Sequence, residues 1–144
     1  MTVLRGRGVS GGTAGGRALV TRMPMNFTAA LTKPRNLIRR SEVQDRHHEL
    51  FRRNLAGRVL VIPSCIGSTY TGMVLLELMF RRVAPAAIVV QAVDSLLVSG
   101  AVLAEVWFDR GIPVVEYAGE DLFEAVSTGD RVEIDGDAGE IRIG

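Results

Sequence analysis

Short apolar runs alternate with longer segments of helical periodicity through the second half of the chain. Three runs, RVLVI, AIVVQ and IPVVE, are typical of buried parallel strands and occupy 58–62, 87–91 and 112–116. The segments that follow them carry apolar positions at helical spacing and predict helices at 69–82, 94–108 and 121–126. Gly100 is a weak point within the second of these helices, because glycine disfavours helix interiors.

The two ends of the chain have the pattern of β-strands instead. Residues 4–16 read as a strand and a glycine-rich turn, and 17–21 as a short strand. At the other end, 130–134 and 140–143 flank the turn sequence DGDAG, which predicts a β-hairpin. Between these regions, 23–55 contains two prolines and little periodicity, so we expect a long loop with one or two helical turns.

Strands that alternate with helices over short connections predict βαβ units around a parallel sheet. The β-rich ends suggest a second small sheet or barrel-like layer beside it. The expected fold class is therefore α/β, with a β/β/α architecture in one domain over 1–144.

Composition narrows the functional classes. The chain has 144 residues, 47% of them apolar and 23% charged, which is a globular composition. Its one cysteine, Cys65, excludes a disulfide framework and an iron–sulfur site built from this chain's thiolates alone. No apolar stretch approaches the length of a membrane span, and the glycine-rich N-terminus lacks a signal-peptide pattern. We expect a cytoplasmic protein with no membrane association.

The net charge of +1 hides an asymmetry along the chain. A basic stretch between positions 33 and 58 contains Lys33, Arg35, Arg39, Arg40, Arg46, Arg52, Arg53 and Arg58, interleaved with three acidic residues. Such a stretch could bind an anionic substrate or an acidic partner, although a solvated face is the more common role. Nucleic acid is disfavoured because no aromatic residues for base stacking alternate with these arginines.

The segment PSCIGSTYTG at 63–72 joins a predicted buried strand to a predicted helix. Ligands collect at this carboxyl edge of open α/β sheets, and the amide groups of a helix N-terminus favour anions. Gly67 permits a sharp turn, and Ser68 would stand at or beside the helix N-terminus, where an alkoxide would be stabilised. Ser68 is therefore the candidate proton acceptor, although simple helix capping is the more common role of such a serine.

Other candidates are weaker. A Ser–His–Asp arrangement would combine Ser68, His48 and Asp45, but no nucleophile elbow is present. His47 and His48 are adjacent rather than a helical turn apart, which favours surface histidines over a metal pair. Cys65 would be reactive if the helix terminus lowered its pKa, although a half-buried small residue is the simpler interpretation.

Residues 55–144 resemble the small, swivelling-domain subunit of the aconitase X family. The resemblance rests on LAGRVLVIP at 55–63 and Gly67-Ser68-Thr69, and on blocks around 74–77, 84–88, 100–105 and 111–115. Closing residues Gly129-Asp130-Arg131-Val132 and Gly139 fit as well.

The resemblance implies a β/β/α swivelling fold and a hydro-lyase small subunit that is inactive alone. It implies that Ser68 acts as the base, with substrate contacts at Gly67, Thr69 and Ser64. It also implies no cofactor bound by this chain, because the iron–sulfur cluster would belong to a large catalytic partner subunit. That partner is expected to meet the loop carrying Ser68 together with the basic stretch.

This chain departs from the family's usual loop, which has arginine where Ile66 stands and serine where Thr69 stands. The region before residue 55 departs further. The family dehydrates cis-3-hydroxy-L-proline or phosphomevalonate. We expect a small hydroxy-acid substrate of the hydroxyproline type, because the arginine-rich composition is unlike that of many archaeal members. Phosphomevalonate is the alternative.

Two further classes stay open at this stage. A phosphohistidine-type swivelling carrier has a similar C-terminal pattern, but it needs a histidine where this chain has Ser99-Gly100-Ala101. A non-catalytic scaffold is the other possibility, since the loop arginine is missing.

Overall fold

Three parallel strands form the centre of the protein, which is described here from a computed structural model covering residues 1–31, 41–66, 70–109 and 111–144. They are β4 (Val59–Ile62), β5 (Ala87–Val90) and β6 (Val114–Glu116). All four residues of β4 and of β5 are buried, as expected for strands covered on both faces. The three predicted apolar runs are therefore strands, with ends within two residues of the prediction.

A long strand, β3 (Thr13–Val20), connects the parallel strands to an antiparallel layer. Its last three residues pair in parallel with β4, whereas Thr13 to Arg17 pair antiparallel with β7 (Arg131–Asp135). The predicted C-terminal hairpin is present as β7 and β8 (Glu140–Ile143), and β8 pairs with β1 (Thr2–Arg5). The second β layer that the chain ends predicted is thus confirmed.

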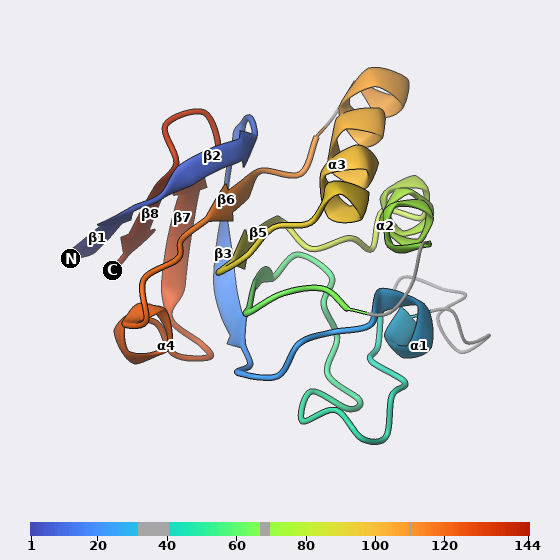
Figure 1. Cartoon of the computed structure of the whole chain (residues 1–144), viewed down its shortest axis with the longest axis horizontal. Coiled ribbons are helices and arrows are strands. Elements are labelled where there is room, and N and C mark those ends of the chain that lie inside the picture. Colours follow the sequence, from blue (N-terminus) through green and yellow to red (C-terminus); the bar gives the residue numbers. More distant parts are fainter. Residues whose placement is uncertain (32–40, 67–69, 110) are drawn as a thin grey trace.

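The two layers belong to one sheet of eight strands in the order β1-β8-β7-β3-β4-β5-β6-β2. Strand β2 (Arg7–Ser10) pairs antiparallel with β6 at the far end of this order. Only Gly6 separates β1 from β2 in the sequence, so the first ten residues link the two ends of the sheet (Figure 1). This link gives the β layers their barrel-like shape.

Alternate residues of the parallel strands face two different cores. Leu60, Ile62 and Val90 point into a core shared with the helices. Val59, Val61 and Val89 point into a second core shared with the antiparallel strands, where they meet β7 and β8. Because side chains alternate across a strand, one apolar run supplies both cores, which produces the β/β/α order of layers.

Helices α2 (Thr71–Phe80) and α3 (Ser95–Phe108) pack side by side over the parallel strands (Figure 1). A Cβ placed on Gly100 would lie 2.6 Å from Gly72 Cα, so the two backbones touch at these glycines. The expected weak point at Gly100 is instead a close backbone contact between the helices, and α3 continues through it without a break. The short predicted helix is α4 (Leu122–Ala125), which packs on the other core.

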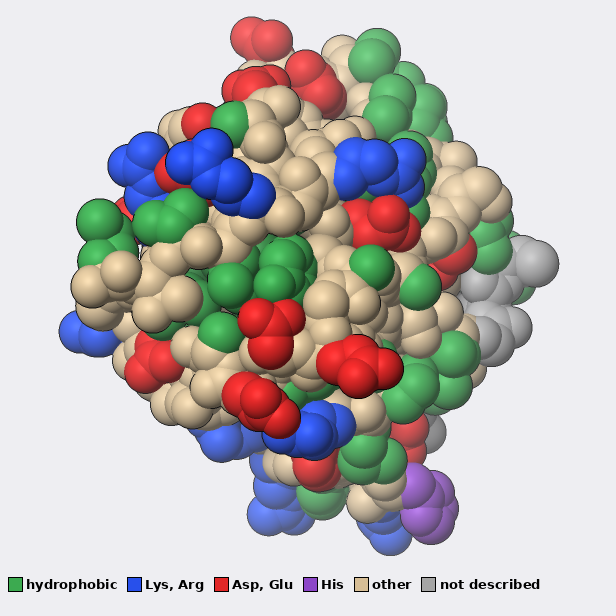
Figure 2. Space-filling view, turned by 60° about the vertical axis from the view of Figure 1, so that its left-hand side comes forward, with side chains coloured by type: hydrophobic (Ala, Val, Ile, Leu, Met, Phe, Trp, Pro, Cys, Tyr) green, Lys and Arg blue, Asp and Glu red, His purple; other side chains and the backbone are tan. Residues whose placement is uncertain are grey.

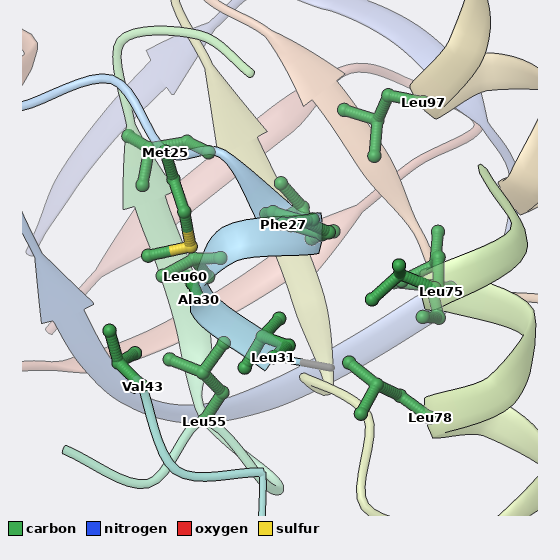
Figure 3. Close-up of a cluster of buried hydrophobic side chains, with 14 of the residues drawn as sticks. Met25, Phe27, Ala30, Leu31, Val43, Leu55, Leu60, Leu75, Leu78 and Leu97 are labelled. Atoms are coloured by element: carbon green, nitrogen blue, oxygen red, sulfur yellow. The ribbon is translucent and has the colours of Figure 1, made fainter. Parts of the chain in front are cut away.

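The described parts of 23–55 form an irregular segment with one short helix, as expected, but they also contribute to the core, which the sequence did not indicate. One helix of five residues is present, α1 (Phe27–Leu31). Its Phe27 and Leu31 point toward Leu75 and Leu78 of α2 (Figure 3). The segment after it is irregular, but it also buries side chains in this core: Val43, Leu50 and Leu55.

Backbone hydrogen bonds explain how the irregular part of this segment keeps its shape. The amide of Val43 donates to the carbonyl of Arg53, and the amide of Arg52 donates back to Val43. The buried hydroxyl of Ser41 donates to the carbonyl of Val83 at 2.6 Å. Such pairing satisfies polar groups that periodic structure would otherwise satisfy. In the part of the chain that is described, no helix has the length and apolarity needed to cross a membrane.

Candidate active-site loop

The loop predicted to carry chemistry leaves the carboxyl end of β4 and leads into α2. Pro63, Ser64, Cys65 and Ile66 form its described first half. Gly67, Ser68 and Thr69, which carry most of the predicted site, lie outside the described residues. What the structure defines is therefore the two flanks of the loop and the groups that hold them.

The first flank is fixed by backbone hydrogen bonds on both sides. The amide of Met25 donates to the carbonyl of Ser64, and the amide of Ile66 donates to the carbonyl of Met25, both at 3.0 Å. On the other side, the carbonyl of Pro63 accepts from the amides of Gln91 and Ala92. These contacts extend β4 beyond its last residue and set the direction in which the chain leaves the sheet. Sequence reasoning missed Met25, because nothing in 23–55 marks it as a strand partner.

The second flank is the start of α2. The N-cap residue is Tyr70, whose side chain makes no capping hydrogen bond, and the helix begins at Thr71. Ser68 precedes this N-cap by two positions in the sequence. The helix has ten residues, enough for its N-terminal amides and dipole to favour an anion nearby. The predicted passage from buried strand to helix is confirmed by these two flanks.

Ser64, a predicted substrate contact, is partly buried at the start of the loop. Its carbonyl is committed to Met25, as described above. Ile66 stands where the resembling family has arginine, and half of its side-chain surface is exposed. The described half of the loop therefore presents an apolar side chain to solvent where a cation was expected from the family pattern.

The thiol of Cys65 has the properties of a structural residue. Burial, and secondarily the negative charge of Asp94, raise its pKa to about 12 from an ordinary value of 9.0. The thiol is therefore protonated at neutral pH, whereas a nucleophilic cysteine needs a lowered pKa. Asp94 itself caps α3 by accepting from the amide of Leu97 at 2.8 Å. The interpretation of Cys65 as a partly buried small residue is confirmed.

The two histidines differ from each other, and the expectation of surface histidines is wrong for His48. His47 is exposed, but His48 retains only 5% of its surface. Its Nδ1 accepts from the amide of Leu50 at 3.0 Å, and its Nε2 lies 3.4 Å from the carbonyl oxygen of Met23. Nδ1 is thus unprotonated and Nε2 carries the proton. Both nitrogens serve the backbone, which gives no support to a triad with Asp45.

The carboxylate of Asp45 has a local role as well. Its side chain accepts from the amide of His47, and its carbonyl accepts from the amide of His48. This is the pattern of a side chain that stabilises a turn. The buried His48 and the turn-forming Asp45 together position the segment that follows α1.

Arg58, the last member of the basic stretch, has a structural role. Arg58 lies at the amino end of β4, the opposite end from the loop, and donates to the carbonyls of Arg17 and Ala18. Burial, together with the charge of Arg53, lowers the pKa of Arg58. Arg58 therefore holds β3 and the turn before β4 together, and the expectation that the stretch meets the partner stays a prediction.

The other basic residues divide into two groups. Arg46, Arg52 and Arg53 are exposed, and the guanidinium of Arg52 lies 5.3 Å from the ring centre of Phe51. The remaining members lie outside the described residues: Lys33, Arg35, Arg39 and Arg40.

Another carboxylate at the carboxyl edge is Glu116, the last residue of β6. The amide of Val93 donates to it at 2.8 Å, and Arg7 donates to its other oxygen at 2.9 Å. The hydrogen bond from Val93, aided by Arg7 and opposed by partial burial, lowers its pKa. In the sequence, the sign of this role was a charged residue at the end of the buried run IPVVE. Through its contact with Arg7, Glu116 joins β2 to the edge of β6.

The described residues bring no group of three or more histidine, cysteine, aspartate or glutamate side chains together in a way that could hold a metal ion. With one cysteine in the whole chain, and that thiol protonated, an iron–sulfur cluster does not fit the described residues. A cluster belonging to the partner stays a prediction.

Comparison with known proteins agrees with this geometry. Residues 3–143 match the family model described as the aconitase X swivel domain. The phosphomevalonate dehydratase small subunit of Archaeoglobus fulgidus is 36% identical over 137 residues, which cover 95% of each chain. Cis-3-hydroxy-L-proline dehydratase of Pseudomonas aeruginosa is 41% identical over 103 residues, which cover 72% of this chain and 17% of that protein.

A solved structure shows the same architecture. The crystal structure of Thermococcus kodakaraensis aconitase X in its holo-form aligns with a TM-score of 0.85 and 29% sequence identity, covering 100% of this chain and 99% of that one. The β/β/α arrangement, the loop position between β4 and α2, and the family match lead to one conclusion. The chain belongs to the aconitase X swivel-domain family.

Proposed function

We propose that this chain is the small subunit of a hydro-lyase and that Ser68 is the base that removes a proton from the substrate. The carrying observation is the bend between β4 and α2, whose first flank is held on both sides by backbone hydrogen bonds. A loop whose start is fixed in this way leaves the sheet at the carboxyl edge of the parallel strands, where ligands bind in such sheets. Gly67, Thr69 and Ser64 are the neighbours that would contact the substrate.

The reaction is the loss of water across a carbon–carbon bond. The oxygen of Ser68, as an alkoxide, takes the proton from one carbon while the carbon–oxygen bond on the next carbon breaks. The electrons of the broken carbon–hydrogen bond form the double bond, and the hydroxyl group leaves with the electron pair of its carbon–oxygen bond. The proton taken by Ser68 then joins this hydroxide, which completes the lost water and regenerates the alkoxide. A Lewis-acidic iron of a cluster in the large partner subunit would accept that leaving group.

The N-terminus of α2 supports the role of the serine. A hydroxyl has a poor tendency to ionise in water, and positive electrostatic potential is needed to stabilise the alkoxide. The dipole of a ten-residue helix supplies such potential near its first turn. The protonated thiol of Cys65 is unsuited to take this role, which removes one alternative to Ser68 from the same loop.

We favour a phosphomevalonate-type substrate over the hydroxyproline type suggested by composition. The relative of Archaeoglobus fulgidus named for phosphomevalonate matches 95% of this chain. The relative named for cis-3-hydroxy-L-proline matches 72% of it. The hydroxyproline type is retained as a second candidate, because identity to that relative is 41%.

The test is to co-express the chain with the aconitase X large subunit of the same organism and to measure dehydration of both substrates. We expect Ser68→Ala to lower kcat by about 10³-fold, within the range for loss of a general base, while the complex still forms. Ser127→Ala, an exposed serine of the β-layer side, is the matched control and should retain full turnover.

Three outcomes would change this proposal. Unchanged turnover in Ser68→Ala would remove the serine from the reaction. Turnover of cis-3-hydroxy-L-proline but not of phosphomevalonate would reverse the substrate assignment. Failure of the wild-type chain to associate with the large subunit would overturn the proposed function as a whole.

A further inference from the structure

Helix α3 exposes large apolar side chains on its outward side. Val106 and Trp107 keep 71% and 63% of their surface, and Val102 keeps 45%. The only charged residue within the helix is Glu105. A surface helix of a globular protein normally presents charged and polar residues to water. An outward face made of large apolar side chains is therefore unusual for a helix in contact with solvent.

Helix α2 continues the same surface. Met73 and Phe80, seven residues apart and therefore on one side of the helix, are 65% and 73% exposed. Glu77 lies between them on this side and forms an ion pair with Arg81, so the apolar surface of α2 is interrupted there by one charged pair. The rings of Phe80 and Phe108 lie 6.4 Å apart, which joins the C-terminal ends of the two helices. We call this surface the apolar helix face; it consists of Met73, Phe80, Leu96, Val102, Leu103, Val106 and Trp107.

The apolar helix face extends to the candidate loop. Tyr70, the N-cap of α2, is 58% exposed, and Ile66 on the other side of the loop is 50% exposed. Exposed apolar side chains therefore run from both flanks of the loop along α2. A protein that covers the loop would reach the start of this face.

The opposite side of the molecule has a different surface. Figure 2 shows positive and negative side chains dispersed among apolar ones on the face that it presents, which includes the antiparallel β layer. Ion pairs occur on that layer, such as Arg131 with Glu133 and Arg142 with Glu140. Exposed apolar area is therefore concentrated on the helical side rather than spread over the whole surface.

We propose that the apolar helix face docks the large subunit of the hydro-lyase. This inference rests on the proposed function, since it assigns a surface to the partner invoked there. The continuity with the loop supports it, because substrate must lie between Ser68 and the partner. The Pseudomonas aeruginosa relative supports the association itself, because the matching region there makes up 17% of one longer chain.

The affinity of the small subunit for the large one tests the proposal. Val106→Glu and Met73→Glu would bury an unpaired charge in the interface, and we expect each to raise the Kd by at least about 30-fold, the size of an interface hot spot. Val3→Glu is the matched control: Val3 is 39% exposed on β1, and its substitution should leave the Kd within about 3-fold. Isothermal titration calorimetry with the separately purified large subunit gives the Kd, and circular dichroism checks that each variant is folded.

Kinetics separate this proposal from the role of Ser68. A docking variant should regain wild-type kcat when the small subunit is in large excess, whereas Ser68→Ala should keep a wild-type Kd and lose kcat. Hydrogen exchange of the wild-type complex gives an independent measure, with slowed exchange expected over 71–80 and 95–108.

Several results would overturn the docking assignment while leaving the proposed function intact. One is an unchanged Kd in both glutamate variants together with unprotected helices. Another is equal weakening by Val3→Glu. A third is a homodimer of the small subunit that uses this face and persists in the active complex. Loss of turnover that excess small subunit does not restore would also contradict it.

Discussion

The helical layer and the antiparallel β layer enclose the same parallel strands, yet they end in different surfaces. On the inside they are alike: each packs apolar side chains against one face of β4 and β5. On the outside, the helical layer exposes Val106, Trp107 and Phe80, whereas the β layer carries ion pairs such as Arg131 with Glu133. Folding explains why the inner face of each layer is apolar. It does not explain the apolar outer face of the helical layer, which points to an interaction with another protein.

The two layers are also held together differently. The β layer is closed by hydrogen bonds between strands far apart in the sequence, with β1 and β2 linking the ends of the sheet. The helical layer depends on close packing, in which the backbones of α2 and α3 touch at Gly72 and Gly100. Added volume should therefore be costly where α2 and α3 touch, and electrostatic changes should matter most where strands join at the edge of the sheet.

The largest expected effects test whether the two cores contribute equally to stability. Leu75 on the helical side and Ile134 on the β side are 0% and 2% exposed. Replacement of either by alanine leaves a cavity, and we expect each variant to lose about 2–5 kcal/mol of unfolding free energy, measured by urea denaturation. A loss below about 1 kcal/mol for Ile134→Ala alone would mean that the β layer is peripheral to the cooperative fold.

A smaller effect is expected at the contact between the helices. A Cβ on Gly100 would lie 2.6 Å from Gly72 Cα and 2.8 Å from its carbonyl oxygen. Gly100→Ala should therefore force the helices apart and lower the unfolding free energy by about 1–3 kcal/mol, even though alanine favours helix formation.

Gly111→Ala is the matched control for this substitution. A Cβ there would meet its nearest neighbour, Glu105 Cβ, at 3.5 Å, an ordinary contact. The change in melting temperature relative to wild type, measured by thermal denaturation, should therefore have the opposite sign in the two variants or be clearly larger for Gly100→Ala. If Gly100→Ala were as stable as wild type, the backbone contact would not determine how α2 and α3 pack.

The smallest effect concerns Glu116, where β2 joins the edge of β6. The amide of Val93 is the main cause of its lowered pKa, and Arg7 adds to it. Because the folded-state pKa lies below the ordinary value of 4.5, the stabilisation is fully present above pH 4.5 and is lost as pH falls through the folded-state pKa. We expect Glu116→Gln to be about 1 kcal/mol less stable at pH 7.

The pH dependence distinguishes this role from a general effect of the substitution. The difference in unfolding free energy between Glu116→Gln and wild type should shrink from pH 7 to pH 3, as measured by urea midpoints. Glu133→Gln removes an exposed pair, with 55% and 54% of the two side-chain surfaces accessible, and should change stability by less than about 0.5 kcal/mol. A pH-independent loss in Glu116→Gln would contradict the electrostatic explanation.

Periodic parts of the chain were predictable, and irregular parts were not. The runs that form β4 and β5 are continuous and apolar, and the helices between them have clear apolar spacing. Residues 23–31 and 41–55 lack such a signal, yet they bury Met25, Phe27 and Val43. Their shape depends on hydrogen bonds to backbone groups that are distant in the sequence. A local pattern of apolar and polar residues does not identify those partners.

The candidate site divides in the same way. The passage from strand to helix at 63–72 followed from the sequence, as did the structural role of Cys65. The burial of His48 and the anchoring of Ser64 and Ile66 by Met25 did not. Adjacent histidines look equivalent in a sequence, and only the packing of the segment around them makes one a buried hydrogen-bonding residue and leaves the other exposed.

By itself, the sequence determined which segments are strands and helices, because alternation and helical spacing are local consequences of burying apolar side chains. Tertiary structure alone decided that β3 divides its length between two partners, that the first ten residues link the ends of the sheet, and that two glycines meet between helices. These features depend on contacts between residues distant along the chain. The free energy that selects them comes from the packing of whole layers, which no single segment encodes.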